Sequence, residues 1–186
     1  MEIKNIINHH INLIKNVEDQ FPLIKKISEN LIQAIKNGNK IFFMGNGGSA
    51  ADSQHLAAEL TGRFQKNRKA LPAIALTTDT SAITAIGNDF SFDDIFKRQI
   101  QGLAVENDAV IGISTSGNSK NIISAIIEAE KKKCYTISLT GNNGGKLKEI
   151  SKESIIVPSQ ITARIQEAHI LIGHIICELI EEAFSD

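Results

Sequence analysis

The feature that most constrains the fold is a short apolar run that stops at glycines and passes directly into a helix. Residues 40–49 read KIFFMGNGGS, and small residues follow at once. Because glycine has no Cβ atom, Gly47 and Gly48 allow the backbone to turn sharply and to direct its amide N–H groups towards a ligand. The first N–H groups of the following helix also lack partners within that helix. We therefore expect a strand, a glycine-rich turn and a helix N-terminus that together can bind an anion such as phosphate.

The rest of the chain repeats this alternation of strands and helices. Short runs rich in β-forming residues predict strands at 40–45, 72–76, 108–113, 134–139 and 154–157. Helical patterns fall between and after them, at 49–62, 80–104, 119–132, 144–150 and 163–184, and two further helices precede the first strand, at 2–17 and 20–37. Strands separated by helices indicate a parallel sheet covered on both faces. The sequence therefore predicts one α/β domain over residues 1–186, with a doubly wound five-stranded parallel sheet in the flavodoxin-like order 2-1-3-4-5.

Composition excludes several classes of protein. Apolar residues make up 42% and charged residues 22% of the chain, and a formal net charge of −1 provides no electrostatic basis for binding nucleic acid. Cys134 and Cys177 lie in apolar patterns and are expected to be reduced core thiols. The most apolar tract, 165–180, contains histidines and glutamates, so we expect no membrane span there. With no export signal visible at the N-terminus, we expect a cytoplasmic protein.

A second loop resembles the first in its position after a strand. Residues 114–119 read STSGNS and follow the apolar run 108–113. Its hydroxyl groups and backbone amides can donate hydrogen bonds to phosphate oxygens. In the order 2-1-3-4-5 the first and third strands are neighbours at the point where the strand order reverses, and ligands bind outside the carboxyl ends of strands there. We therefore expect both loops to border one crevice that binds an anionic ligand.

Two nucleotide-binding motifs are matched incompletely. Gly45 to Ala50 fits the G-x-G-x-x-A pattern of dinucleotide-binding proteins, but the acid near the end of the second strand, Asp79, lies well beyond the expected spacing of about 20 residues. Residues 141–146 resemble a P-loop that is one residue short, and Leu147 stands where Ser or Thr should bind magnesium. We therefore expect no nucleotide cofactor.

A histidine and a glutamate follow the glycine-rich turn. His55 and Glu59 are four residues apart, so they lie on one face of the predicted helix and can act as an acid–base pair or as metal ligands. In the last helix, His174 follows Gln166 by eight residues, while His169 follows it by three and competes as a partner on spacing alone. Spacing alone leaves His174 open to a second interpretation, a histidine buried in the core.

Taken in this set and order, the motifs resemble the phosphoheptose isomerases, the sedoheptulose 7-phosphate isomerases of the sugar-isomerase (SIS) superfamily. The resemblance rests on the glycine-rich turn, the His55/Glu59 pair, the sequence Gly87-Asn88-Asp89, the STSGNS loop, and Arg164, Gln166 and His174. It covers essentially the whole chain. The STSGNS loop alone marks the superfamily, whereas the His55/Glu59 pair joined to Gln166 and His174 is far more specific.

The resemblance implies an aldose–ketose isomerisation of D-sedoheptulose 7-phosphate to D-glycero-D-manno-heptose 7-phosphate, the first step towards nucleotide-activated heptose for a surface polysaccharide such as lipopolysaccharide or capsule. It implies that Glu59 is the base that moves a proton between C1 and C2 and that His174 is the acid at the carbonyl oxygen, with an enediol intermediate. The expected substrate-binding residues are Asn46, Gly47, Gly48, Glu59, Arg63, Asn88, Asp89, Ser114, Thr115, Ser116, Ser119 and Gln166.

Members of the family also bind zinc, and the matching ligands are His55, Glu59, Gln166 and His174. Gln166 and His174 are separated by about 12 Å of helix rise and about 80° of turn. Spacing therefore predicts that a curved helix, or two different subunits, would be needed to bring both to one ion.

The resemblance further implies a homotetramer with active sites at subunit boundaries. The last helix is apolar on nearly every side, and Gly173 within it favours a close approach of another helix. We expect the N-terminal extension, 1–37, to pack on the sheet and on neighbouring subunits. Two alternatives remain open from the sequence: a non-catalytic SIS protein that binds a replication-initiator partner, and an isomerase for another sugar phosphate.

Overall fold

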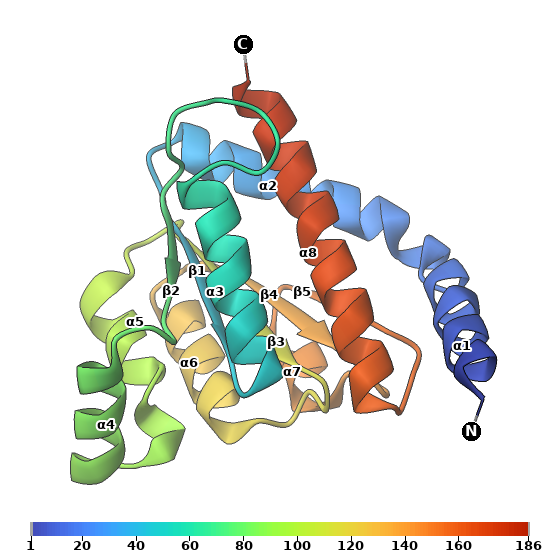
Figure 1. Cartoon of the computed structure of the whole chain (residues 1–186). Coiled ribbons are helices and arrows are strands. Elements are labelled where there is room, and N and C mark those ends of the chain that lie inside the picture. The colour runs from blue at the N-terminus through green and yellow to red at the C-terminus, as the bar shows by residue number, and fades with distance from the viewer. Residues whose placement is uncertain (1, 186) are drawn as a thin grey trace.

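A parallel sheet of five strands forms the centre of the computed structural model, which describes residues 2–185 (Figure 1). The strands are β1 Ile41–Gly45, β2 Ala73–Ala75, β3 Ala109–Ser114, β4 Tyr135–Thr140 and β5 Glu153–Ile156, in the order β2-β1-β3-β4-β5. The predicted sheet order is therefore confirmed. β1 pairs with β3 in parallel, with Gly45 opposite Ile113, so both strands end at the same level and the loops that follow them lie on one edge of the sheet.

Neighbouring residues of the central strands supply two different cores. Successive side chains of a strand point to opposite faces of the sheet, and both faces of β1 and β3 are buried. Phe43 and Ile111 belong to the core on one face, whereas Phe42 and Val110 belong to the core on the other. This explains why these strands read as continuous apolar runs, as expected for a parallel sheet covered by helices on both sides.

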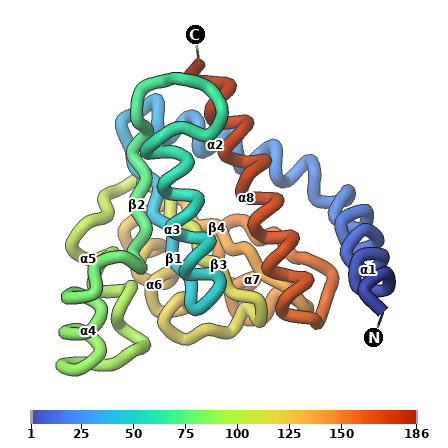
Figure 2. Tube along the Cα trace, in the orientation of Figure 1, coloured from blue at the N-terminus to red at the C-terminus, as the bar shows by residue number. Residues whose placement is uncertain are grey.

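The helices divide between these two cores. The core that contains Phe43 is completed by α1 Ile3–Lys15, α2 Phe21–Lys36, α3 Gly48–Thr61 and α8 Thr162–Phe184. The other core is completed by α5 Lys97–Leu103, α6 Lys120–Lys131 and α7 Gly145–Ile150, with partly buried residues of α4 Thr80–Asp89 packed against it. Figure 2 shows α3 and α8 running side by side across one face, with α1 at the margin of the molecule.

The predicted helix 80–104 is the main error of the sequence-based assignment. The structure divides it into α4, a short 3₁₀ helix at Phe92–Asp94 and α5. The chain leaves the helical conformation at Phe90 and is extended at Ser91, whose hydroxyl donates to the Asp94 carboxylate at 2.8 Å. Serine side chains of this kind compete with helical hydrogen bonding, which the apolar pattern does not reveal.

Two other predictions concern the cysteines and the absence of a membrane span. Cys134 and Cys177 are buried and form no disulfide in the described part of the chain, as expected for core thiols, and burial raises their pKa to about 11 and about 12. Among residues 2–185 there is no helix with the length and apolar character that crossing a membrane requires.

Candidate active site

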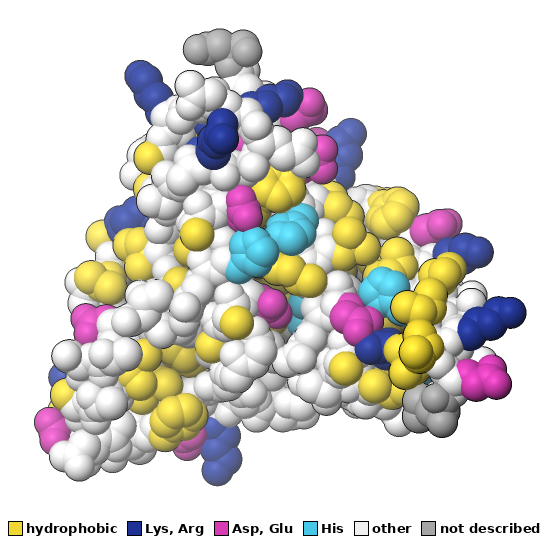
Figure 3. Space-filling model, viewed as in Figure 1, with side chains coloured by type: hydrophobic (Ala, Val, Ile, Leu, Met, Phe, Trp, Pro, Cys, Tyr) yellow, Lys and Arg dark blue, Asp and Glu magenta, His cyan; other side chains and the backbone are white. Residues whose placement is uncertain are grey.

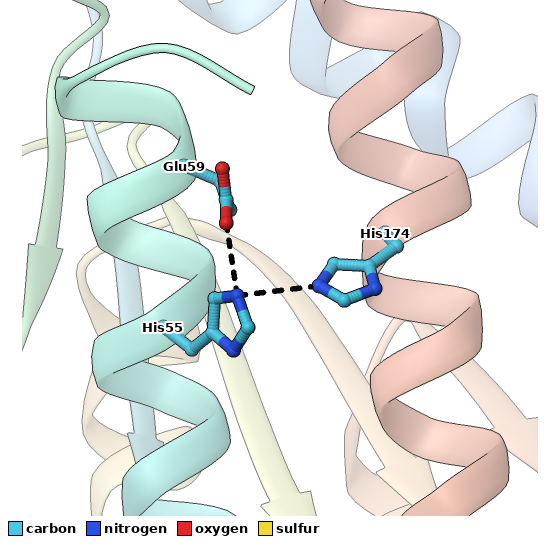
Figure 4. A group of neighbouring side chains, drawn as sticks. All are labelled: His55, Glu59 and His174. Carbon is cyan, nitrogen blue, oxygen red and sulfur yellow. Dashed lines mark hydrogen bonds and ion pairs between the residues drawn. The ribbon is translucent and has the colours of Figure 1, made fainter. Parts of the chain in front are cut away.

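Side chains from α3 and α8, which cover the same face of the sheet, converge on one another (Figure 4). His55 Nε2 lies 2.8 Å from Glu59 Oε1 and 3.4 Å from His174 Nε2, and the two imidazole rings meet edge to face with centroids 4.9 Å apart. One ligand atom from each of the three residues lies within 4.8 Å of the others. The cluster is open to solvent: Figure 3 shows histidine side chains beside an acidic side chain on this face.

Local packing explains how two helices far apart in the sequence bring these groups together. His55 and Glu59 share a face of α3 because they are one helical turn apart. On α8, Gly173 packs directly on α3: a Cβ atom at this position would lie 2.6 Å from both methyl carbons of Leu56. The absence of a side chain at Gly173 therefore allows His174, the next residue, to reach His55. The close helix approach expected from Gly173 is confirmed, and it occurs within one chain.

Gln166 lies two turns before His174 on α8 and faces the glycine-rich turn. A Cβ atom at Gly48 would lie 2.5 Å from Gln166 Nε2, so the amide sits directly on the backbone where α3 begins. His174 of the same chain lies opposite His55 without help from another subunit. The structure thus brings His55, Glu59 and His174 into one cluster and places Gln166 at the adjoining turn.

The hydroxyl-rich loop after β3 is the second part of the predicted site. Ser114 Oγ lies 3.0 Å from Ser119 Oγ and 3.5 Å from Ser116 Oγ, so hydroxyl groups from both ends of the loop converge. Gly117 at the tip has φ +67°, and a Cβ atom there would overlap the carbonyl group of Gly144. The loop is thus compact, and its clustered hydroxyls suit an anionic group.

A pair of asparagines joins the two loops. Asn46 and Asn121 exchange hydrogen bonds through their side-chain amides, at 3.0 and 2.8 Å. Asn121, in the first turn of α6, is 2% exposed and also accepts from the backbone N–H of Ile122 at 2.9 Å. This contact joins the turn after β1 to the start of α6, the helix that directly follows the hydroxyl-rich loop. Sequence reasoning missed Asn121 because its partner lies 75 positions away.

Two further residues beside the cluster were also missed. The Phe64 ring lies 5.5 Å from the His174 ring, centroid to centroid, and covers one side of it. Asp52, one turn before His55 on α3, has a buried carboxylate oxygen without a hydrogen-bond partner among the described residues. Burial raises the pKa of this carboxyl group, and nearby His55 partly opposes that shift. In the sequence, Asp52 could have been found because it lies three residues before His55 and therefore shares its helix face.

Four other residues singled out in the sequence form no hydrogen bond with this cluster in the described part of the chain. His169 is 1% exposed and its Nε2 bonds the carbonyl oxygen of Thr140 at 3.0 Å, so it is a core histidine rather than a member of the site. The Asn88 side chain donates a hydrogen bond to the Asp89 carboxylate at 2.9 Å. Both residues are exposed at the end of α4, on the β2 side of the sheet. Arg63 is exposed, two residues beyond the end of α3.

The fold and this set of residues define the class of protein. A family model for the SIS domain matches residues 7–141, so the chain belongs to the SIS domain family. The phosphoheptose isomerase from a Nitratiruptor species is 59% identical over 153 residues, covering 82% of both proteins, and that from Aliarcobacter butzleri is 51% identical over 98% of this chain and 97% of its own. A solved structure of phosphoheptose isomerase from Neisseria gonorrhoeae superposes with a TM-score of 0.92 at 42% identity, covering 97% of each chain. Within the SIS class, the chain therefore belongs to the phosphoheptose isomerase family.

Proposed function

We propose that this protein is a sugar-phosphate isomerase that converts D-sedoheptulose 7-phosphate to D-glycero-D-manno-heptose 7-phosphate. The observation that carries the proposal is the cluster of Glu59, His55 and His174 on α3 and α8, in a chain whose hydroxyl-rich loop lies at the same edge of the sheet as the turn that begins α3. The cluster supplies groups that transfer protons, and the loop suits a phosphate. The names of the family members that match over nearly the whole chain support the same activity.

Within this proposal, Glu59 and His174 share the proton transfers. Glu59 removes the proton from one of the two carbons C1 and C2 and returns it to the other. His174 donates a proton to the carbonyl oxygen as the enediol forms and takes back the proton of the neighbouring hydroxyl group as the new carbonyl forms. Their ligand atoms lie within 4.8 Å of each other, a separation that allows one group to act at a carbon and the other at the adjacent oxygen. The electrons of the broken C–H bond form the enediol, so the step needs no external oxidant or reductant.

We assign the phosphate to the hydroxyl-rich loop and the sugar to the glycine-rich turn. The phosphate-binding residues are Ser114, Thr115, Ser116 and Ser119, and the proposed sugar contacts are Asn46, Gly47, Gly48, Arg63, Asn88, Asp89 and Gln166. The Asn46–Asn121 pair supports this division because it fixes one loop relative to the other.

The cluster also suits a zinc ion, which we propose as a cofactor at one per subunit. Two imidazole nitrogens and a carboxylate oxygen are donors that zinc takes, and the three atoms lie close enough together to face one ion. His55, Glu59 and His174 would bind the ion, with Gln166 as the fourth proposed ligand. When bound, zinc would supply a Lewis acid for an oxygen of the substrate.

The proposed assembly is a cytoplasmic homotetramer with residues 1–186 as a single domain in each subunit. Exposed apolar side chains gather on α1, α2 and α8, and include Ile3, Ile7, Ile11, Phe21, Leu171 and Leu179. A hollow of about 400 Å³ between α2 and α8 is lined by Phe21, Ile24, Lys25, Ile175 and Leu179. Contiguous apolar surface of this kind marks protein interfaces.

The test is to incubate the purified protein with sedoheptulose 7-phosphate and to follow formation of the aldose. We expect Glu59→Gln and His174→Ala to lower kcat by about 100-fold or more, as for the loss of a general base or acid. Glu106→Gln, which changes an exposed carboxylate outside α1 and outside the site, should leave turnover unchanged. An inactive wild type would refute the proposed reaction, and turnover that survives both site variants would refute the residue roles. Parallel assays with shorter ketose phosphates test the substrate assignment.

A further inference from the structure

A buried carboxylate on α8 holds the segment that follows α3. Glu181, seven residues after His174, is 2% exposed. It accepts hydrogen bonds from the backbone N–H groups of Phe64, Gln65 and Lys66, at 2.9, 2.7 and 2.9 Å. Glu181 Oε1 also lies 3.3 Å from Arg68 Nε. We call residues 62–72 the strap, and Glu181 is its anchor on α8.

Arg68, within the strap, connects it to the end of the helix that carries Glu59. Its guanidinium is 1% exposed and donates to the Leu60 carbonyl at 2.8 Å and to the Glu59 carbonyl at 2.7 Å. The last carbonyl groups of a helix lack partners within the helix, and a cation there is favourable for the helix dipole. Arg68 therefore fixes the backbone of Glu59 itself.

The first amide bonded by Glu181 belongs to the residue that covers His174. The ring of Phe64 lies 5.5 Å from that of His174, with the two planes tilted by 32°. The strap thus contacts both proposed proton-transfer residues, one through the Arg68 guanidinium and the other through the Phe64 ring. Glu181 and Arg68 themselves are buried, with side chains that are 3% and 1% exposed.

The charge of Glu181 is well compensated. Burial raises the pKa of its carboxyl group, but three N–H donors and Arg68 lower it more, so the pKa lies below its ordinary value and the group is ionised at neutral pH. A buried carboxylate with this many donors is a rigid connection, and removing its charge leaves donors unpaired. By contrast, the neighbouring pair Lys66–Glu182 joins the same two segments with side chains that are 52% and 66% exposed, so it should contribute little.

We propose that Glu181 and Arg68 are positioning residues for the isomerase: they hold the strap so that Phe64 stays against His174 and the end of α3 stays fixed at Glu59. The inference rests on the proposed function. Neither residue touches substrate, and the effect passes through the strap.

The first experiment compares Glu181→Gln with the matched control Glu182→Gln. Both lose one carboxylate from α8 beside the strap, but only the first loses the buried connection. At a temperature where circular dichroism shows both variants folded, we expect Glu181→Gln to lower kcat by about 10- to 100-fold, with a smaller change in KM, because small displacements of catalytic groups have effects of this size. Glu182→Gln should match the wild type. Amides 64–66 should exchange hydrogen faster in Glu181→Gln alone.

A double-mutant cycle tests the route through Phe64. If Glu181 acts by placing the ring, Glu181→Gln combined with Phe64→Leu should lose far less activity than the product of the two single losses. Losses that multiply would overturn that route. If Glu181→Gln does not fold, Glu181→Asp replaces it in the cycle, because aspartate keeps the charge but its shorter side chain cannot reach all three amides of residues 64–66.

The experiments distinguish a failure of this inference from a failure of the proposed function. An inactive wild type refutes the function, and the strap is then judged from the NMR signals of the His174 ring, which Glu181→Gln should shift and Glu182→Gln should not. An active wild type with normal kcat and unchanged ring signals in Glu181→Gln would overturn the positioning role.

Discussion

His169 shows how a single residue can resemble a site residue in the sequence and have another role in the structure. It lies on the same helix as His174, but its ring is buried against the Thr140 carbonyl. Burial lowers its pKa to about 4, while the hydrogen bond to Thr140 raises it slightly. The neutral ring is therefore part of the core, and its protonation should favour the unfolded chain.

The stability of the protein should depend on pH because the pKa of His169 differs between the folded and the unfolded chain. The folded pKa, about 4, is below the unfolded value of 6.5, so between these values the unfolded chain binds more protons. The contribution of His169 is then complete above pH 6.5 and is lost as the pH falls towards 4, which amounts to about 3 kcal/mol of unfolding free energy. Urea unfolding at a series of pH values between 7 and 4 measures this slope.

Two variants separate His169 from the other titrating groups. His169→Gln should have a shallower slope over this window than the wild type, whatever its absolute stability. His9→Gln, at an exposed position, should keep the wild-type slope. Equal slopes for all three proteins would show that His169 is not the group responsible.

At the scale of elements, most of the fold could be predicted because strand and helix periodicities are local. The runs 40–45 and 108–113 predicted β1 and β3 to within one residue at each end, and the glycine-rich and hydroxyl-rich loops that follow them lie at one edge of the sheet. The break between α4 and α5 was not predicted because it lies within an apolar pattern, which does not reveal the Ser91–Asp94 hydrogen bond that follows the end of α4.

The candidate site was predictable only where its residues share an element or a known motif. The spacing of His55 and Glu59 defines their common face, whereas the family resemblance was needed to select His174 over His169. Phe64 and Glu181 gave no signal, because they meet across 117 positions of sequence through a backbone amide. Contacts of this kind depend on how α8 crosses α3, which no local pattern specifies.

The crossing of these two helices yields a prediction of its own. Gly173→Ala places a Cβ atom 2.6 Å from the Leu56 methyl carbons, in a tightly packed position. We expect a loss of about 1–3 kcal/mol in unfolding free energy from overpacking, larger than the gain of up to about 1 kcal/mol in helix propensity. Turnover should also fall, because α8 must move away from α3 and carry His174 with it. Urea unfolding and steady-state kinetics measure both effects.

A glycine in an open position provides the control for Gly173. A Cβ atom at Gly102, in α5, would meet no atom within 4 Å. Gly102→Ala should therefore stabilise the protein by about 0.5–1 kcal/mol and leave turnover unchanged. If Gly173→Ala behaved in the same way, close packing at this crossing would not be what positions His174.

At the scale of the whole molecule, α1 is the part whose packing the single chain leaves most incomplete. Its one buried residue is Leu13, while Ile3, Ile7 and Ile11 are 79%, 54% and 45% exposed. A helix needs tertiary packing of its apolar face for most of its stability. The proposed tetramer would supply that packing, since α1 lies at the margin of the chain, beside α8 (Figure 1).

Assembly and activity should therefore depend on the exposed face of α1. Light scattering should give four times the chain mass for the wild type, and Ile7→Glu should lower this mass, because a charge replaces an apolar side chain at the proposed interface. Ile127→Glu changes a comparably exposed isoleucine on α6, on the other side of the sheet, and should keep the wild-type mass.

If Ile7→Glu also loses turnover while its His55 cluster remains folded by NMR, the active site needs a neighbouring subunit. A wild type with the mass of one chain at all concentrations would instead leave α1 as a free apolar surface and contradict the tetramer.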